Sequence, residues 1–537
     1  MGRISRRTFN RMAAATGALA ALPSSLAHSQ VRFASPPFQL GVASGDPAAD
    51  GFVIWTRLAP EPFAPETLGD TIFEVTWEVA EDAQFTRIAK QGVAWARPHL
   101  AHAVHVEVTG LAAGREYFYR FRLGRYESAT GRALTCPAAD AATASMKFAF
   151  ASCAHYEQGF FSAYRYMAED RPDLILMLGD YIYEDAWGDR RVRQFDTIEA
   201  VTLADYRNRY AQYRTDPDLQ AAHAACPWLV TWDDHEVDND YVSLTSEHEL
   251  CGGEAVRASF AARRAAAYQA WFEHMPVRPS RLRPEMAVQI YGAVDWGTLA
   301  RFHVLDTRQY RSVQVCPNQP TAMRCDFAKG RKILFGGAGG ANFINPLDSS
   351  CKASLADPSR TMLGAEQERW LDESLAGSSA AWNLLTQNVM VMTVAEGTVE
   401  SPRHYSDAWA GYPPARERLF ASLVRNRASN PVVLTGDIHS FWVNELANAA
   451  SRTVAVELVT SSIATSTYDK SAHLPLNSGT KFHDGLHNGY VRCELGRETL
   501  KADIVTIENR EDARSGRHVA ASFEVRSGDP HAHRIAI

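Results

Sequence analysis

Four apolar runs of this chain end in residues whose side chains can bind metal ions or move protons. The runs lie in "MKFAFASCAH" (146–155), "DLILMLGDYIYE" (173–184), "WLVTWDDHEVDNDY" (228–241) and "NPVVLTGDIHSFW" (430–442). A single aspartate after a strand is more often a turn former or a helix cap than a metal ligand. Capping does not explain why the same pattern occurs at four strand ends. The pattern predicts that the four ends contribute residues to one site. The residues that follow the runs are Cys153, Asp180, Tyr183, Asp234, His235, Asn239, Asp437 and His439.

The mixture of ligand types predicts two unlike metal ions. A carboxylate such as that of Asp180 can give one oxygen to each of two cations and hold them close together. The thiolate of Cys153 and the phenolate of Tyr183 suit a strongly Lewis-acidic ion such as Fe(III). Carboxylate and amide oxygens suit Ca²⁺, Mn²⁺ or Mg²⁺. Cys153 is therefore expected to be a metal ligand and not a disulfide partner; a small buried side chain is the alternative interpretation.

These segments, together with "LDTRQYR" (305–311), resemble the PhoD-type alkaline phosphatases and phosphodiesterases of the metallophosphatase superfamily. The site of that family is related to that of purple acid phosphatases. "FQLGVASGDPAADGFVIWTRL" (38–58) is similar to the start of the family's N-terminal β-sandwich, so the resemblance covers nearly the whole chain after the first thirty residues. It implies an α/β fold with a two-sheet sandwich flanked by helices, preceded by an all-β immunoglobulin-like domain.

The resemblance also implies roles for the strand-end residues. Asp180 would bridge two metal ions, and Cys153 and Tyr183 would complete much of the Fe(III) coordination sphere. His439 would bind a metal ion, and Asp437 would either bind one or orient the site. The second ion would be Ca²⁺, with Mn²⁺, Mg²⁺ or Zn²⁺ as substitutes.

The loop 234–239 offers two alternative metal ligands and a catalytic histidine. Asn239 is a candidate ligand on the calcium side, while Asp234 stands where many metallophosphatases have a ligand asparagine. His235 follows Asp234 and matches the family's catalytic histidine. The sequence leaves open which of Asp234 and Asn239 binds metal, so Asp234 and His235 are both expected in the catalytic machinery.

Two further segments carry site predictions. "DAWAGY" (407–412) keeps Asp407 of the family's D-x-W-D-G-Y segment as a predicted metal ligand, but Ala410 replaces the second aspartate. Arg207 is the arginine we expect to stabilise phosphate, because a guanidinium can bind it through two parallel hydrogen bonds. Arg308 is expected instead to form a buried ion pair around the site. His155, close to Cys153, either binds phosphate or caps its loop.

The elements that must position these residues divide the chain in two. Residues 38–143 contain short β-branched and aromatic runs broken by Gly, Pro and Asp, which predicts an immunoglobulin-like sandwich. From 146 to 510, continuous apolar strands alternate with helical stretches, which predicts a sheet buried on both faces. Sites on such sheets form at the carboxyl ends of the strands. Residues 511–537 are expected to be a C-terminal extension.

The first thirty residues read as a removable export signal. They contain four arginines, an Ala/Gly-rich segment and a small-residue end, and Arg6 and Arg7 form the twin arginine of Tat signals. No later stretch approaches the roughly 18 unbroken apolar residues of a membrane span. We therefore expect a periplasmic or secreted protein with no stable membrane anchor and with the Tat machinery as an export partner.

Oxidising compartments permit disulfides, and the suggested pairs are Cys316–Cys325 and Cys251–Cys351.

The resulting functional hypothesis is a secreted metal-dependent phosphoric ester hydrolase that uses a metal-activated hydroxide, acting as an alkaline phosphatase or phosphodiesterase in phosphate scavenging. The net charge of −7 gives no electrostatic reason to expect sequence-specific nucleic-acid binding. The alternatives are a phospholipase D-type phosphodiesterase and a non-catalytic metal-dependent phosphate-binding protein. A haem or flavin enzyme is disfavoured, because the chain has no C-x-x-C-H segment and no dinucleotide fingerprint.

Overall fold

The computed structural model describes residues 32–537 except 189, 198, 247–253, 284–286, 316–322, 327–330 and 335–342. The predicted export signal (1–30) lies outside the described residues, and so do Cys251 and Cys316 of the suggested disulfides. Cys351 is disulfide-bonded. Free thiols are found at Cys136, Cys153, Cys226 and Cys493. The expectation that Cys153 is not a disulfide partner is therefore confirmed.

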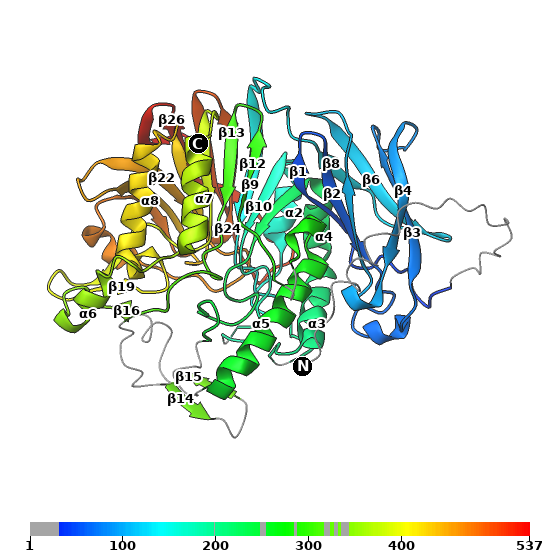
Figure 1. Cartoon of the computed structure of the whole chain (residues 1–537), viewed down its shortest axis with the longest axis horizontal. Helices are drawn as coiled ribbons and strands as arrows, with labels where there is room; N and C mark the ends of the chain where they lie inside the picture. The colour runs from blue at the N-terminus through cyan, green and yellow to red at the C-terminus, as the bar shows by residue number, and fades with distance from the viewer. Residues whose placement is uncertain are drawn as a thin grey trace, which may run out of the picture.

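A ten-stranded sheet runs through the centre of the molecule, in the order β27-β26-β25-β24-β9-β10-β11-β1-β2-β5 (Figure 1). Strands β9, β10 and β11 are parallel to one another, and β1 is parallel to β11. In chain order its strands are β1 (Val42–Ala48), β2 (Gly51–Arg57), β5 (Ala103–Val108), β9 (Ser145–Ala151), β10 (Leu174–Leu178), β11 (Pro227–Thr231), β24 (Asn488–Gly496), β25 (Thr499–Ile507), β26 (Arg517–Arg526) and β27 (Asp529–Ile535).

A seven-stranded sheet packs against the first, in the order β12-β13-β17-β20-β22-β21-β23. Strands β13, β17, β20 and β22 are parallel. The strands are β12 (Gly292–Trp296), β13 (Ala300–Val304), β17 (Trp382–Thr386), β20 (Pro431–Thr435), β21 (Phe441–Ala447), β22 (Thr453–Val459) and β23 (Thr480–Asp484). Short strands outside this sheet are β14 (Met323–Asp326), β15 (Arg331–Leu334), β16 (Phe343–Ile344), β18 (Ala395–Gly397) and β19 (Pro402–Tyr405).

Strand β10 shows why the apolar runs are continuous. Leu176 faces the core between the two sheets, where it joins Leu384 of β17 and Leu458 of β22. Its neighbours Ile175 and Met177 face the other side and pack into a core formed with helices. Because successive side chains of a strand point to opposite faces, a strand covered on both faces must be apolar at every position.

Helices cover the outer faces of both sheets, which gives four layers. Helices α2 (Ser162–Glu169), α3 (Leu203–Arg214), α4 (Pro217–Ala225) and α5 (Glu254–His274) pack on the ten-stranded sheet. Helices α7 (Gly364–Ala376) and α8 (Pro413–Arg425) pack on the seven-stranded sheet, and α6 (Ser349–Leu355) lies apart from them (Figure 1). No helix in the described part of the chain has the length and apolar character needed to cross a membrane. The predicted α/β two-sheet sandwich flanked by helices is confirmed.

The N-terminal region is a β-sandwich, but it shares a sheet with the rest of the molecule. A five-stranded sheet of β3 (Phe73–Ala80), β4 (Ile88–Ala96), β6 (Glu116–Leu123), β7 (Tyr126–Glu127) and β8 (Gly131–Leu134) packs against β2 and β5. Strand β1 pairs with β11, so β1, β2 and β5 extend the central sheet. The predicted boundary at 143–146 therefore separates two sequence segments and not two sheets.

The residues of the predicted C-terminal extension form two strands of the ten-stranded sheet. Residues 511–537 contain β26 and β27, and β26 pairs with β25 along its whole length. Their buried side chains Ala521, Phe523 and Val525 belong to the core between the two large sheets.

Candidate metal centre

The parallel strands of both sheets end at one place, and the residues that follow them meet there. Within each of three groups, one ligand atom per residue lies within 4.8 Å of the others. The groups are Cys153–Asp180–His439, Asp180–Asp234–His235 and Asp233–Asp234–Asp437. Asp180 belongs to the first two groups and Asp234 to the last two. The geometry is therefore a row of adjoining sites that share carboxylates, as expected for a centre with more than one cation.

The first group is closed by Tyr183. Its hydroxyl donates to Asp180 Oδ2 at 3.0 Å and lies 3.1 Å from His439 Nε2. Cys153 Sγ lies 3.4 Å from the same Asp180 oxygen. Thr465 places its hydroxyl 3.2 Å from the Tyr183 hydroxyl and donates to the Cys153 carbonyl at 2.8 Å. A thiol, a phenol, an imidazole and a carboxylate thus converge on one point.

The second group contains an imidazole that is held by a carboxylate. His235 Nδ1 lies 2.7 Å from Glu184 Oε2. The other oxygen of Glu184 accepts the backbone N–H of Asn239 at 3.0 Å. This contact orders the loop, whose next backbone N–H, that of Asp240, donates to Asp234 Oδ2 at 2.7 Å. Glu184 therefore fixes both the ring of His235 and the loop that carries Asp234.

The third group is bounded by a buried arginine, as predicted for Arg308. Its guanidinium pairs with Asp233, lies 3.5 Å from Asp234 Oδ1 and lies 2.7 Å from Asp407 Oδ2. Arg311 pairs with the other oxygen of Asp407 and also donates to its backbone carbonyl at 2.9 Å. Arg308 has no exposed surface. One wall of the site is therefore cationic.

The carboxylates of the centre carry an unbalanced negative charge. Burial raises the pKa of Asp180 and of Asp437 well above the usual range, and nearby aspartates raise both further. Burial would also raise the pKa of Asp234, but Arg308 holds it at about 2. Burial and the charge of Asp180 raise the pKa of the Cys153 thiol. Such a set favours bound cations, because they remove the mutual repulsion and the cost of burying the charges.

Several residues of the centre have strained backbone. Positive φ angles occur at Cys153 (60°), Asp180 (53°), Asp437 (65°) and His439 (53°). This region is uncommon for residues other than glycine and persists where the surrounding structure enforces it. The carboxylate of Glu236 holds the second strand end by accepting the backbone N–H groups of Asp180 at 3.1 Å and of the next residue at 2.6 Å.

Gly179 is required by the approach of two loops. Its φ is +96°, and a Cβ there would lie 2.5 Å from the Cβ of Asp233. The loops after β10 and β11 can therefore come together only when this position has no side chain. Asn388, which follows β17, completes the junction by donating to the carbonyls of Leu178 at 2.9 Å and Trp232 at 2.7 Å.

The residues present fit metal ions. Among the described residues, Asp234 Oδ1 and Asp437 Oδ2, which belong to one ligand group, are buried without a hydrogen-bond partner. Buried polar atoms nearly always have partners, so unpaired acceptors that converge are best explained by a cation. Arg308 and Arg311 pair with Asp233, Asp234 and Asp407, and a cation would balance the remaining carboxylates Asp180 and Asp437.

Two predicted site residues have other roles in the structure. Arg207 donates to both oxygens of Glu273, at 2.7 and 2.6 Å, and to the carbonyl of His99, so its guanidinium is occupied away from the centre. Asp407 pairs with Arg308 and Arg311 through its two oxygens and belongs to none of the three ligand groups, so it orients these arginines. Ion-pair partners distant in sequence are not visible in a motif, and a phosphate role for Arg207 and a metal role for Asp407 stay predictions.

The structure also bears on the choice between Asp234 and Asn239. Asp234 lies in two of the three ligand groups. Asn239 lies beside them through its backbone contact with Glu184, and its side-chain amide donates to Asp240 at 3.3 Å. Asp234 is thus the better placed of the two, and a ligand role for Asn239 stays a prediction.

Four residues of the centre were not singled out from the sequence. Asp233 and Glu236 flank predicted residues of the same loop, and Glu184 follows Tyr183, so a search of every polar residue after a strand would have found them. Thr465 comes six residues after β22 in "SSIATS" (461–466), which carries no ligand pattern. Its position depends on the fold alone.

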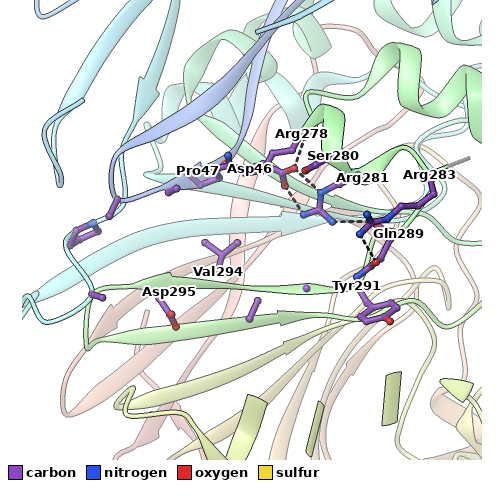
Figure 2. A pocket seen from close by; sticks show the side chains of 16 residues that line it. Asp46, Pro47, Arg278, Ser280, Arg281, Arg283, Gln289, Tyr291, Val294 and Asp295 are labelled. Carbon is purple, nitrogen blue, oxygen red and sulfur yellow. Dashed lines mark hydrogen bonds and ion pairs between the residues drawn. The ribbon is translucent and has the colours of Figure 1, made fainter. Parts of the chain in front are cut away.

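A cavity of about 450 Å³ lies elsewhere, between the N-terminal sandwich and the segment 278–295 (Figure 2). Two of its charged residues pair with each other: Arg281 donates to both oxygens of Asp46, at 2.7 and 2.8 Å. Arg278 donates its backbone N–H to Asp46 as well, at 2.8 Å. No residue of the three ligand groups lines this cavity.

Comparison with known proteins identifies close relatives. The family model described as "PhoD-like phosphatase" matches residues 148–504, and the model described as "PhoD-like phosphatase, N-terminal domain" matches residues 24–137. Alkaline phosphatase D of Bacillus subtilis (strain 168) is 42% identical over 486 residues, which cover 88% of this chain and 78% of that protein. A solved structure described as "Structure of PhoD" is similar with a TM-score of 0.85 at 39% identity, and the match covers 94% of this chain and 93% of that one.

Proposed function

This chain belongs to the PhoD-like phosphatase family, and we propose on that premise that it is an exported hydrolase whose adjoining buried sites hold Fe(III) and Ca²⁺. An alkaline phosphatase D-like phosphoesterase activity follows from the family. The observation that carries the proposal is the row of ligand groups that share Asp180 and Asp234, with unpaired acceptor atoms pointing into it.

The ligand chemistry supports an iron position and a calcium position. Cys153, Tyr183 and His439, with one oxygen of Asp180, would hold Fe(III), because thiolate and phenolate suit a strongly Lewis-acidic ion. Asp234 and Asp437, with Asn239 as a further candidate, would hold Ca²⁺, for which Mn²⁺, Mg²⁺ or Zn²⁺ could substitute. The shared carboxylate of Asp180 would keep the ions adjacent.

The bound ions would supply Lewis acidity to the phosphoryl group and to a water nucleophile. The chain itself supplies a proton. Burial would lower the pKa of His235, but Glu184 and the aspartates Asp234 and Asp180 raise it well above its ordinary value. The imidazole of His235 is therefore the proposed proton donor. Because Glu184 holds Nδ1, the proton available for a departing alkoxide is the one on Nε2.

The second contribution of the chain is the positive charge of Arg308 beside the ligand groups. Arg308 was expected to be structural, and its guanidinium lies against three aspartates, so we propose that it acts on the substrate through them. It keeps Asp234 ionised and so ready to bind a cation. No serine or threonine stands in a nucleophile-like context beside the motifs, which favours direct attack by water over a phosphoserine intermediate.

The proposed location is the periplasm or the exterior. It rests on the twin arginine Arg6–Arg7 in an N-terminal segment that has the composition of a Tat signal. Scavenging of phosphate from esters outside the cell is the role that suits a broad phosphoesterase there. A fusion of residues 1–35 to a reporter that folds before export, compared with the same fusion carrying Arg6→Lys and Arg7→Lys, tests this. Equal export of both fusions would contradict it.

The decisive experiment combines metal analysis with paired substrates. Protein recovered from its own compartment is analysed for metals by mass spectrometry and assayed on an aryl phosphate monoester and on the matching bis-aryl diester. We expect iron and calcium, and ester cleavage that is lost on chelation and returns when metal is restored. The faster ester decides between monoesterase and phosphodiesterase, and a long-chain phospholipid as third substrate tests the phospholipase alternative. Protein without metal that still hydrolyses esters would refute the proposal.

A further inference from the structure

Beside the proposed iron position lies a buried imidazole whose proton has no acceptor. His155 has no exposed surface. Its Nδ1 accepts the backbone N–H of Glu157 at 3.2 Å, and its own backbone N–H donates to Thr465 Oγ1 at 3.3 Å. The loop-capping role considered for His155 is thus present. Because Nδ1 is an acceptor, the proton of the neutral ring must be on Nε2. That atom has no hydrogen-bond partner among the described residues.

A second unpaired donor lies next to it. The indole Nε1 of Trp187 is buried and likewise has no hydrogen-bond partner in the described part of the chain. Its ring stands perpendicular to that of His155, with the ring centroids 5.6 Å apart. The loop that carries Trp187 is anchored, because Gln158 donates to the Trp187 carbonyl at 2.9 Å while its own oxygen accepts from Ser466.

Both rings pack on residues of the centre. The centroid of His155 lies 4.6 Å from that of Tyr183. The indole of Trp187 is parallel to the His439 ring, at 7° and 6.2 Å, and Tyr468 stacks near His439 at 8° and 5.4 Å. The two unpaired N–H groups are therefore held by rigid aromatic contacts at the side of the centre that contains Tyr183 and His439.

We propose that His155 Nε2–H and Trp187 Nε1–H form a donor pair that binds an oxygen of the phosphate group, in substrate and in product. Buried donors nearly always have partners, and two adjacent ones without a partner point to a ligand that completes them. Neutral N–H donors are strengthened when the acceptor is charged, as a phosphate oxygen is. The inference rests on the proposed function, and it takes the place of the arginine that was expected from the sequence.

Neutral donors also suit the position. A further cation beside the centre would compete with metal ions for the same carboxylates, whereas an N–H group does not. Nδ1 of His155 accepts the backbone N–H of Glu157, so the ring presents its proton on Nε2. The pair would therefore select for an oxyanion by hydrogen bonding without disturbing the ligand groups.

Three conservative variants separate the donor from the ring that carries it. Trp187→Phe removes the indole N–H and keeps an aromatic ring against His439. His155→Asn keeps an acceptor for the Glu157 N–H and removes the Nε2 donor, whereas His155→Gln returns an amide N–H to about the Nε2 position. Trp370→Phe on α7 is the matched control, since Trp370 packs on Tyr291, outside the centre.

The readouts are the inhibition constant of inorganic phosphate, the KM of an aryl phosphate, and the metal content of each variant. We expect Trp187→Phe and His155→Asn each to raise the inhibition constant and the KM about tenfold, the loss of one hydrogen bond to a charged acceptor. His155→Gln should recover most of this loss, and Trp370→Phe should match the wild type. Metal content should be unchanged in all four.

Two results would overturn the inference. One is an unchanged phosphate inhibition constant in Trp187→Phe and His155→Asn at normal metal content. The other is loss of metal in these variants, which would make the rings supports of the ligands Tyr183 and His439 and not contacts of the phosphate. An inactive wild-type enzyme would instead refute the proposed function, so the two failures are distinguishable. If His155→Asn does not fold, Trp187→Phe decides alone, since it deletes only the N–H and part of one ring.

Discussion

Buried charges are paired at the joint between the N-terminal sandwich and helices α3 and α5, whereas several buried carboxylate oxygens are unpaired at the metal centre. The joint is the contact region that contains Asp46, Arg207, Glu273 and Arg281. At the joint, Arg281 pairs with Asp46 through both oxygens, and Arg207 pairs with Glu273 in the same manner. At the centre, Asp180 and Asp437 are buried among other aspartates, and acceptor atoms are left unpaired. Backbone strain does not distinguish the two regions, because Asp46 has a φ of 44° and Asp180 one of 53°.

The difference teaches how a ligand site can be recognised in a buried interior. A buried ion pair is complete in itself, and it serves stability or the specificity of the domain arrangement. Converging acceptors of one sign are unstable without a further component, so they indicate a bound cation. What marks the centre is therefore the missing partner and not burial, charge or strain alone. The following predictions test that distinction, beginning with the largest effect.

The first prediction compares two aspartates that are equally buried and equally strained. Asp180→Asn should lower turnover at least about 1,000-fold and reduce the bound metal, because a neutral amide cannot bridge two cations. Asp46→Asn should keep metal and activity within about twofold, and should only lower stability. Metal analysis and ester hydrolysis on both variants check this. A variant Asp180→Asn that keeps its metal and its activity would remove the basis for a bridging carboxylate.

The second prediction concerns the arginine that borders the centre. Arg308→Met should lower the free energy of unfolding by about 3–5 kcal/mol, because it leaves buried carboxylates without their counter-charge. The control is Arg301→Gln, whose partner Asp295 is 39% exposed, and which should cost about 1 kcal/mol or less. Urea unfolding monitored by tryptophan fluorescence measures both. Equal losses would show that Arg308 is an ordinary ion-pair residue.

The third prediction uses pH at the joint. Burial lowers the pKa of His105 to about 4, although its ring donates to the Met275 carbonyl at 3.0 Å. The unfolded chain binds this proton near pH 6.5 and the folded protein near pH 4, so the unfolded state takes up the extra proton between these values. Stability should therefore fall as pH falls through that window, by at most about 3 kcal/mol from this residue.

The matched variant for this prediction is His105→Gln, which keeps a donor for Met275 but does not titrate. Its free energy of unfolding should depend less on pH between 6.5 and 4 than that of the wild type, with equal slopes above pH 7. Urea unfolding at a series of pH values gives the comparison. Parallel curves for the two proteins across the whole range would show that His105 is already free to protonate when folded.

The smallest effect is expected at Arg207, which the sequence analysis assigned to phosphate and which pairs with Glu273 in the structure. Arg207→Gln should leave kcat/KM within about twofold. It should cost about 1–2 kcal/mol of stability, less than a fully buried pair, because Gln269 also donates to Glu273, at 2.9 Å. Steady-state kinetics and thermal unfolding test both parts. A tenfold or larger fall in kcat/KM at full metal content would support the role in phosphate binding that the sequence predicts for Arg207.

Local sequence was enough for the residues that must follow a strand. Cys153, Asp180, Asp234, Asp437 and His439 were all predicted, and all lie in the ligand groups. The apolar runs revealed the strands, strands buried on both faces imply helices on both sides, and parallel strands bring their carboxyl ends together. The family resemblance added metal roles and the fold class. The strands and the residues that follow them depend on periodic or local sequence, and so they can be recognised within short segments.

Tertiary structure alone decided which groups pair. Arg207 and Glu273 are 66 residues apart, and Asp407 lies 96 residues from Arg311; nothing in their own segments showed that each carboxylate was already taken. The same holds for Thr465 beside Tyr183, for the unpaired donors of His155 and Trp187, and for the strands of 511–537 that complete the central sheet. The physical reason is that the free energy of a buried charge or donor depends on what surrounds it in three dimensions. A sequence can therefore supply the ligands of this centre, but only the fold determines which of them remain without a partner and so are free to bind.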